Sequence, residues 1–272
     1  MTAAGLYEQI LQKKSFLCVG LDTDIGKIPQ FLHHGASPVL EFNKKIIDAT
    51  HDLAIAYKPN LAFYEARGVE GWTDLKKSVE YIRSVDPDIF LIADAKRGDI
   101  GNTGAMYAKA FFEEMDFDAI TISPYMGRDT VTPFLGYEGK WVILLGLTSN
   151  PGAENFQFLE TGSGQNRLFE EVIRQGAEWG GTDQVMFVAG ATRAELIRDI
   201  RKILPNHFLL VPGIGAQGGN LKEVVDAGLN DQCGLIVNAS RSILYAGDNE
   251  TFDHAARKQT LALQQEMAAL LS

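Results

Sequence analysis

Short apolar runs alternate along the chain with longer stretches of helical spacing, and this alternation limits the possible folds strongly. Eight runs rich in Val, Ile and Leu occupy residues 16–21, 55–58, 89–93, 119–122, 141–145, 185–188, 208–211 and 235–237. Nearly continuous apolar character, in place of strict alternation, is typical of parallel strands that are covered on both faces. The sequence therefore predicts a parallel sheet.

The segments between these runs carry the apolar spacing of helices. We expect helices over residues 39–51, 73–85, 104–114, 128–135, 165–179, 193–203 and 221–226, and a last helix from about residue 254. Eight βα units predict a closed (β/α)8 barrel, or TIM barrel, with an open doubly wound sheet as the alternative. No linker divides the chain, so residues 1–272 are predicted to form one domain. The long polar loop at about residues 150–165 is expected to be an active-site lid, with a merely variable loop as the alternative.

The charge balance limits the partners of the chain. Its 272 residues carry 25 Lys and Arg against 35 Asp and Glu, a formal net charge of −10. Basic clusters suited to nucleic acid do not occur, so we expect no nucleic-acid partner. The apolar runs are far shorter than the roughly 20 residues of a membrane span, so we expect no membrane association. Cys18 and Cys233 both lie in apolar runs, which is typical of reduced thiols in a cytoplasmic protein.

Charged residues stand at the ends of the first three predicted strands. Asp22 follows the first strand, Lys58 ends the second, and the third leads into Asp94, Lys96 and Asp99. The carboxyl ends of the strands carry the active site in a (β/α)8 barrel, and charges there are costly unless they are paired or functional. Asp94 and Lys96 point the same way in an extended strand. They are therefore candidates for acid–base chemistry, with a structural salt bridge as the alternative.

A second group of residues favours a phosphate ligand. A glycine-rich segment at residues 212–219 follows the seventh strand, and Arg241 follows the eighth. Glycines let backbone N–H groups approach an anion, arginine binds phosphate in a bidentate way, and this is the usual phosphate position in such barrels. The glycine spacing also matches a dinucleotide fingerprint, but it lies near the C-terminus with Asn238 and Arg241 downstream, which speaks against NAD.

Taken in order, these residues resemble the orotidine 5'-phosphate decarboxylase family. The resemblance rests mainly on the segment IADAKRGDIGNT at residues 92–103. It is supported by GLD at 20–22, YKP at 57–59, SNPG at 149–152, PGIGAQGG at 212–219 and SRS at 240–242. The chain length and the segment VNASR at 237–241 are similar to the longer bacterial subgroup.

The resemblance implies a homodimer that decarboxylates orotidine 5'-phosphate to UMP, the last step of UMP biosynthesis, with no metal and no organic cofactor. It implies that Lys96 donates a proton to C6 of the pyrimidine, that Asp94 stands beside the departing carboxylate, and that Asp99 comes from the other subunit. Lys58 would belong to this catalytic network. The substrate-binding residues that it implies are Asp22, Lys58, Thr103, Ser149, Pro151, Gln217, Gly218 and Arg241.

Two other functions stay open at this point. Related barrels decarboxylate or condense sugar phosphates with a metal ion, which they bind through a carboxylate at the end of the second strand. Lys58 stands there in this chain and would repel the ion. The other alternative is a barrel that binds a nucleotide without catalysis, but binding alone does not need a charge cluster as costly as Asp94, Lys96, Asp99 and Lys58.

Overall fold

A closed barrel of parallel strands forms the centre of the computed structural model, which describes residues 1–162, 166–191, 194–214 and 219–271. The strands follow the order β1-β10-β9-β8-β5-β4-β3-β2, and β1 pairs with both β10 and β2. They are β1 (Leu17–Gly20), β2 (Ala56–Lys58), β3 (Phe90–Arg97), β4 (Ala119–Ile122), β5 (Trp141–Leu147), β8 (Val185–Ala189), β9 (Leu209–Pro212) and β10 (Leu235–Ala239). The predicted (β/α)8 barrel is confirmed.

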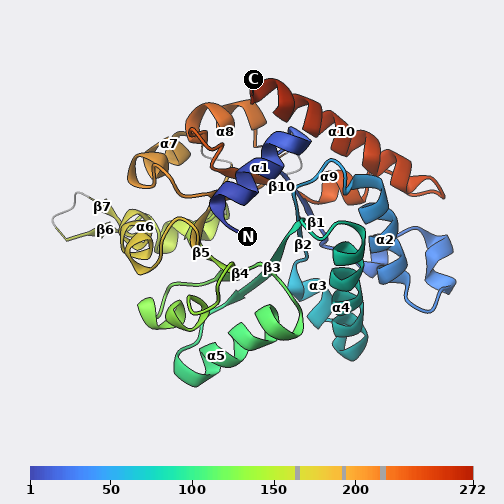
Figure 1. Cartoon of the computed structure of the whole chain (residues 1–272), viewed down its shortest axis with the longest axis horizontal. Helices are drawn as coiled ribbons and strands as arrows, with labels where there is room; N and C mark the ends of the chain where they lie inside the picture. The colour runs from blue at the N-terminus through green and yellow to red at the C-terminus, as the bar shows by residue number, and fades with distance from the viewer. Residues whose placement is uncertain (163–165, 192–193, 215–218, 272) are drawn as a thin grey trace.

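Helices surround this barrel (Figure 1). They are α1 (Ala3–Lys13), α2 (Pro38–Thr50), α3 (Leu61–Glu65), α4 (Gly68–Val85), α5 (Gly101–Lys109), α6 (Leu168–Trp179), α7 (Ala194–Ile203), α8 (Leu221–Gly228), α9 (Arg241–Leu244) and α10 (Phe252–Leu270). The covering helices bury one apolar stripe each, as α7 does with Leu196, Ile197 and Ile200. Burial of this stripe is what holds such a helix against the sheet.

One predicted helix is wrong. Residues 128–135 form two short 3-10 turns, η4 (Arg128–Thr130) and η5 (Thr132–Phe134). Pro133 has no N–H group to donate to the carbonyl of Asp129, and its ring disfavours helical backbone at Thr132. The helix expected over residues 104–114 is present as α5, continued by the π-helical turn η3 (Ala110–Glu114).

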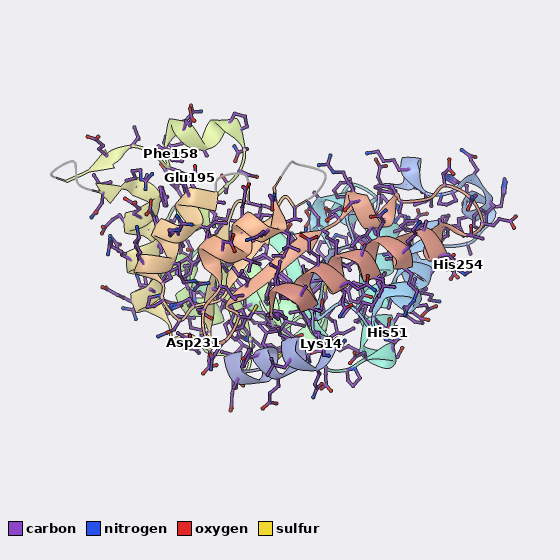
Figure 2. All side chains as sticks on the ribbon, turned by 90° about the horizontal axis from the view of Figure 1, so that it is seen from above. Lys14, His51, Phe158, Glu195, Asp231 and His254 are labelled. Carbon is purple, nitrogen blue, oxygen red and sulfur yellow. The ribbon has the colours of Figure 1, made fainter. Side chains whose placement is uncertain are left out.

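Helix α1 crosses the end of the barrel where the strands begin. In Figure 2 it lies on the opposite side from Phe158 and the hairpin of β6 (Glu160–Thr161) and β7 (Asn166–Arg167). Its buried residues include Ala3, Leu6 and Ile10. This spacing is helical, although α1 is not among the predicted helices.

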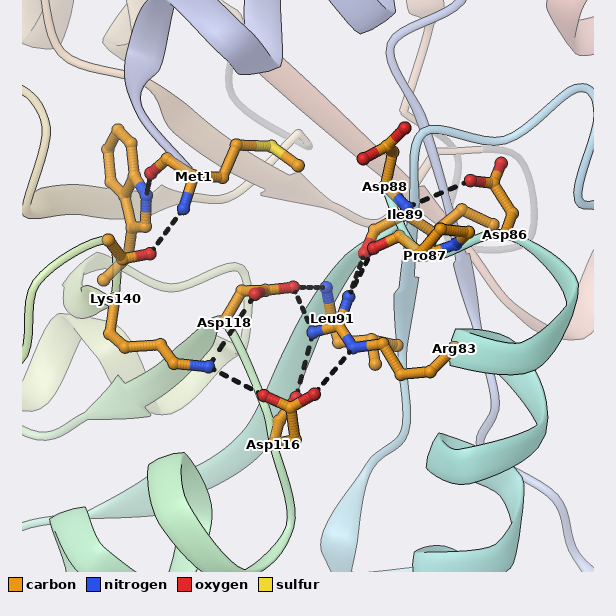
Figure 3. Close-up of polar contacts among 12 residues, drawn as sticks. Met1, Arg83, Asp86, Pro87, Asp88, Ile89, Leu91, Asp116, Asp118 and Lys140 are labelled. Carbon is orange, nitrogen blue, oxygen red and sulfur yellow. Dashed lines mark hydrogen bonds and ion pairs between the residues drawn. The ribbon is translucent and has the colours of Figure 1, made fainter.

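A polar cluster closes the same end of the barrel (Figure 3). Asp118 accepts hydrogen bonds from the Arg83 guanidinium at 2.7 Å and from the backbone N–H of Leu91 at 2.8 Å. The N-terminal ammonium of Met1 donates to the carbonyl of Gly139 at 2.7 Å. These contacts tie α4 and the start of the chain to the starts of the strands, and the opposite end of the barrel holds the candidate site.

The segment expected to be a lid contains the 3-10 turn η6 (Pro151–Asn155) and strand β6, which pairs with β7 directly after the segment. Residues 163–165 of this segment lie outside the described residues. Both cysteines are buried and free. None of the helices in the described part of the chain has the length and apolar character needed to span a bilayer.

Candidate active site

Three charged side chains meet where β2 and β3 end. Lys58 Nζ lies 2.8 Å from Asp94 Oδ2, and Lys96 Nζ lies 2.5 Å from Asp94 Oδ1. The side chains of Lys58 and Asp94 are 5% and 10% exposed, whereas that of Lys96 is 51% exposed. The carboxylate is therefore held between one buried and one accessible ammonium group.

The electrostatics of this cluster keep Asp94 and Lys58 ionised. Burial opposes the charge on Asp94, but Lys58 and Lys96 outweigh it and hold the pKa of the carboxyl well below its usual range. Burial also opposes the charge on Lys58, but Asp94 and Asp22 outweigh it and raise the pKa of the amine. An accessible ammonium beside a fixed carboxylate can donate a proton or stabilise a negative charge that develops next to it.

A bulge in β3 gives the cluster its geometry. The pairing with β4 runs from Ala93 opposite Ile120 to Arg97 opposite Ile122, so residues 94–96 of β3 all stand opposite Thr121. Lys96 has a φ of 47°, which is uncommon for a residue other than glycine. Bulges bend a strand and redirect its side chains. Asp94 and Lys96 do lie together, although through a bulge and not through the extended strand expected from the sequence.

Two cavities open on the cluster. The larger, of about 300 Å³, is lined by Lys58, Asp94, Lys96, Thr121, Leu145, Thr148, Ser149, Asn150, Val188, Leu210 and Pro212. The smaller, of about 150 Å³, is lined by Asp22, Lys58, Asp94, Pro212, Gly213, Ile214, Asn238, Ser240 and Arg241. Because the two share Lys58, Asp94 and Pro212, one ligand can contact both Lys96 and Arg241.

The smaller cavity has two unused acceptors. Asp22 Oδ1 and Asn238 Oδ1 are buried and have no hydrogen-bond partner among the described residues. Buried polar atoms are nearly always paired, so hydroxyl groups of a ligand would complete them. Gly20 lets the turn after β10 approach β1 here, because a Cβ atom at Gly20 would lie 1.9 Å from Ser240 Oγ.

The glycine-rich segment leaves β9 at Gly213, whose φ of 100° favours glycine. Gly219 returns to this point, and its N–H donates to the carbonyl of Gly213 at 3.2 Å. Gln217 and Gly218, both predicted to bind substrate, lie outside the described residues.

Three predicted site residues are not among the described residues that line the cavities. Asp99 accepts a hydrogen bond from the N–H of Ile100 at 2.8 Å, and Thr103 is exposed in α5. Pro151 begins η6 directly after Asn150, at the rim of the larger cavity. The structure therefore brings together Asp22, Lys58, Asp94, Lys96, Ser149 and Arg241.

Several lining residues are absent from the predicted site. Thr148 and Asn150 flank Ser149, and Asn238 and Ser240 precede Arg241. Their positions next to predicted site residues could have indicated that they line the site. Thr121 is the one polar residue of the β4 segment AITI, and its signal was a hydroxyl inside an apolar strand. Within the described ranges, no group of three or more His, Cys, Asp or Glu is placed to hold a metal ion.

The fold and this site define a class of protein: a (β/α)8-barrel enzyme with a lysine–carboxylate cluster at the carboxyl ends of its strands. Residues 15–255 match the model of the Orotidine 5'-phosphate decarboxylase / HUMPS family. The chain belongs to this family, as the motifs indicate.

Relatives match over nearly the whole chain. The orotidine 5'-phosphate decarboxylase of Bacteroides fragilis (strain YCH46) is 59% identical over 271 residues, which cover 100% of this chain and 98% of the relative. The enzyme of the same name from Flavobacterium johnsoniae is 56% identical, with 100% and 98% covered. The structure of Leishmania donovani OMP decarboxylase is similar with a TM-score of 0.85 and 36% identity, covering 99% of both chains.

Proposed function

We propose that the chain converts orotidine 5'-phosphate to UMP and CO2, and that Lys96 supplies the proton that replaces the carboxylate at C6. Membership of the family and high identity with decarboxylases over the full chain support the reaction. The observation that carries the role of Lys96 is its 2.5 Å contact with Asp94 at the larger cavity.

The reaction leaves an electron pair that the protein must stabilise. When the bond from C6 to the carboxylate breaks, CO2 departs and the pair stays on C6 in the plane of the ring, where the π system does not delocalise it. The Lys96 ammonium stabilises this charge and transfers a proton to C6. UMP leaves, and the neutral amine regains a proton from water. Asp94 holds the ammonium in place and disfavours the substrate carboxylate more than neutral CO2.

The remaining residues bind the substrate. Arg241 would hold the phosphate, Ser149 the edge of the pyrimidine, and Asp22 with Lys58 the ribose hydroxyls. Asp22 Oδ1 supports this assignment, because it is buried and has no donor within the described part of the chain. Roles in binding for Pro151, Gln217 and Gly218 rest on the family resemblance. The free buried cysteines and a free nucleotide as substrate support a cytoplasmic location.

A turnover assay tests this function. Purified protein is incubated with orotidine 5'-phosphate in D2O, and UMP is followed by NMR. We expect UMP with deuterium at C6 from the natural chain and none from Lys96→Ala. Absence of UMP with the natural chain refutes the reaction. Substantial turnover by Lys96→Ala, with the natural chain active, refutes the proton donor alone.

We extend the proposal to a homodimer with shared sites. Asp99 and Thr103 are not among the described residues that line the two cavities, and they lie beside exposed apolar side chains. Ile100 directly follows Asp99 and is 49% exposed, and Met106, which lies about one helical turn after Thr103 in α5, is 62% exposed. Exposed apolar patches mark interaction surfaces. A second copy docked there would receive Asp99 and Thr103 at its own site.

Mixed dimers test the sharing. Lys96→Ala and Asp99→Ala proteins should each be nearly inactive, but their mixed dimer has one intact site. Random exchange makes about half of the dimers mixed, so about a quarter of the natural activity should return. A mixture of Lys96→Ala with Asp94→Asn is the control, since both residues come from one chain and no activity should return. If mixed dimers of the first pair form without activity, the sharing is refuted.

A further inference from the structure

Thr121 lies behind the catalytic pair and contacts both of its members. It belongs to β4 and is only 1% exposed. Its Oγ1 accepts a hydrogen bond from the backbone N–H of Lys96 at 2.9 Å and donates one to Asp94 Oδ1 at 3.2 Å. A hydroxyl has one hydrogen and two lone pairs, so the two bonds can exist together.

The bulge explains why a hydroxyl is needed here. Residues 94–96 stand opposite Thr121 alone, and the N–H of Lys96 donates a hydrogen bond to the Thr121 side chain at 2.9 Å. The left-handed backbone of Lys96 is unfavourable for a lysine, and it persists only where the surroundings fix it. The Thr121 hydroxyl is such a fixed point, since a buried threonine on a central strand has little freedom at χ1.

The same hydroxyl orients the carboxylate. Asp94 Oδ1 receives both the Thr121 hydroxyl and the Lys96 ammonium, while Oδ2 receives the Lys58 ammonium. These three donors come from β2, β3 and β4, and together they fix the orientation of the Asp94 carboxylate. The Thr121 hydroxyl therefore connects the backbone N–H of Lys96 to the Asp94 carboxylate, which the Lys96 ammonium also contacts.

We propose that Thr121 is a positioning residue for the reaction, which fixes the turn at Lys96 and the orientation of Asp94 so that the Lys96 ammonium stands at C6 of the substrate. This inference rests on the proposed function. Misplacement of a reacting group by about 1 Å can cost a factor of about 100 in rate. Substrate contacts of Arg241 and Ser149 do not depend on Thr121.

Two substitutions separate positioning from packing. Thr121→Val keeps the shape and removes both hydrogen bonds, whereas Thr121→Ser keeps the hydroxyl and removes a methyl group. We expect kcat to fall about 10- to 100-fold in Thr121→Val with KM changed less than about threefold, and Thr121→Ser to recover most of kcat. Thr260→Val is a control, since it removes a buried hydroxyl that donates to the carbonyl of Ala256 in α10. It should turn over normally.

Hydrogen exchange gives a readout that does not need turnover. The Lys96 amide should exchange at least about tenfold faster in Thr121→Val than in the natural chain or Thr121→Ser. The Asp94 amide, which donates to the carbonyl of Pro59 at 3.1 Å, should keep its protection.

A normal kcat and a protected Lys96 amide in Thr121→Val would overturn the positioning role and leave the proposed function standing. A lower kcat in Thr121→Ser than in Thr121→Val would also overturn it, because packing would then dominate. If the natural chain formed no UMP, the proposed function would fail, and the exchange rate would still decide whether Thr121 holds Lys96.

Discussion

Replacing Lys58 with methionine removes a buried ammonium group and keeps most of the side-chain volume. Among the described residues, Asp94, at 10% exposure, then keeps only the half-exposed Lys96 as a cationic partner. Removing one member of a buried ion pair costs about 3 to 5 kcal/mol, whereas an exposed pair contributes about 0 to 1 kcal/mol. We therefore expect Lys58→Met to lower the free energy of unfolding at pH 7 by about 3 to 5 kcal/mol. Lys96→Met should lower it by less than about 1 kcal/mol.

The pH dependence of this difference follows from the two shifted groups. The pKa of Asp94 is lowered on folding, so its contribution is present above the unfolded pKa of about 4 and is lost as the pH falls through the folded value. The pKa of Lys58 is raised, so its contribution is present below the unfolded pKa of about 10.4 and is lost as the pH rises through the folded value. The pair contributes fully from about pH 5 to pH 9. In Lys58→Met, protonation of Asp94 removes a buried negative charge that has lost its buried cationic partner, so the loss of stability should become smaller as the pH falls from 7 toward 5.

Urea unfolding at pH 7 and pH 5, with thermal midpoints, measures the effect. At about 2 to 4 °C per kcal/mol for a chain near this size, Lys58→Met should melt about 6 to 20 °C lower at pH 7. Lys96→Met is the matched control, because it removes the other ammonium from the same carboxylate. Equal urea midpoints for the two variants would refute the claim that burial makes Lys58 the stabilising partner.

Three further predictions concern the reaction. Lys96→Ala should bind UMP within a fewfold of the natural affinity by calorimetry, since the phosphate and ribose contacts remain; a loss of binding would contradict this. Arg241→Ala should raise KM by about 10- to 150-fold, because a charge-assisted contact contributes about 1.5 to 3 kcal/mol; an unchanged KM would place the phosphate elsewhere. Dialysis against a chelator should leave the rate unchanged, and activity lost there and restored by Mg2+ would favour the metal-dependent alternative.

The barrel was predictable because strands covered on both faces must be apolar along their length. The eight predicted runs correspond to the eight barrel strands, with β3 extending to Arg97 beyond the expected end at residue 93. The helix expected over residues 128–135 is absent because Pro133 cannot donate a backbone hydrogen bond, and this local effect outweighs the helical spacing of the apolar residues. Helix α1 was missed although its apolar spacing was readable.

The charged part of the site was predictable for a similar reason, since a barrel gathers the ends of its strands into one place. The bulge was not. The order of Asp94, Ala95 and Lys96 is typical of a strand, and nothing in it indicates that the backbone of Lys96 has a positive φ. The role of Thr121 depends on that bulge, so it needed the three-dimensional register. Asp99 and Thr103 stay assigned by resemblance, because the role proposed for them requires a second copy of the chain.

The β3 bulge also bears on how such a barrel could acquire new chemistry. Residues 94–96 lie opposite one residue of β4, Thr121. The pairs on either side, Ala93 with Ile120 and Arg97 with Ile122, keep the sheet in register, so the side chains of residues 94–96 can change without a change in strand pairing. A change of catalytic groups there would leave most of the backbone pairing of the barrel intact. In a duplicated gene, substitutions at residues 94–96 could therefore change the reaction while the barrel still folds. Thr121, which lies opposite these residues and bonds to them, would have to change together with them.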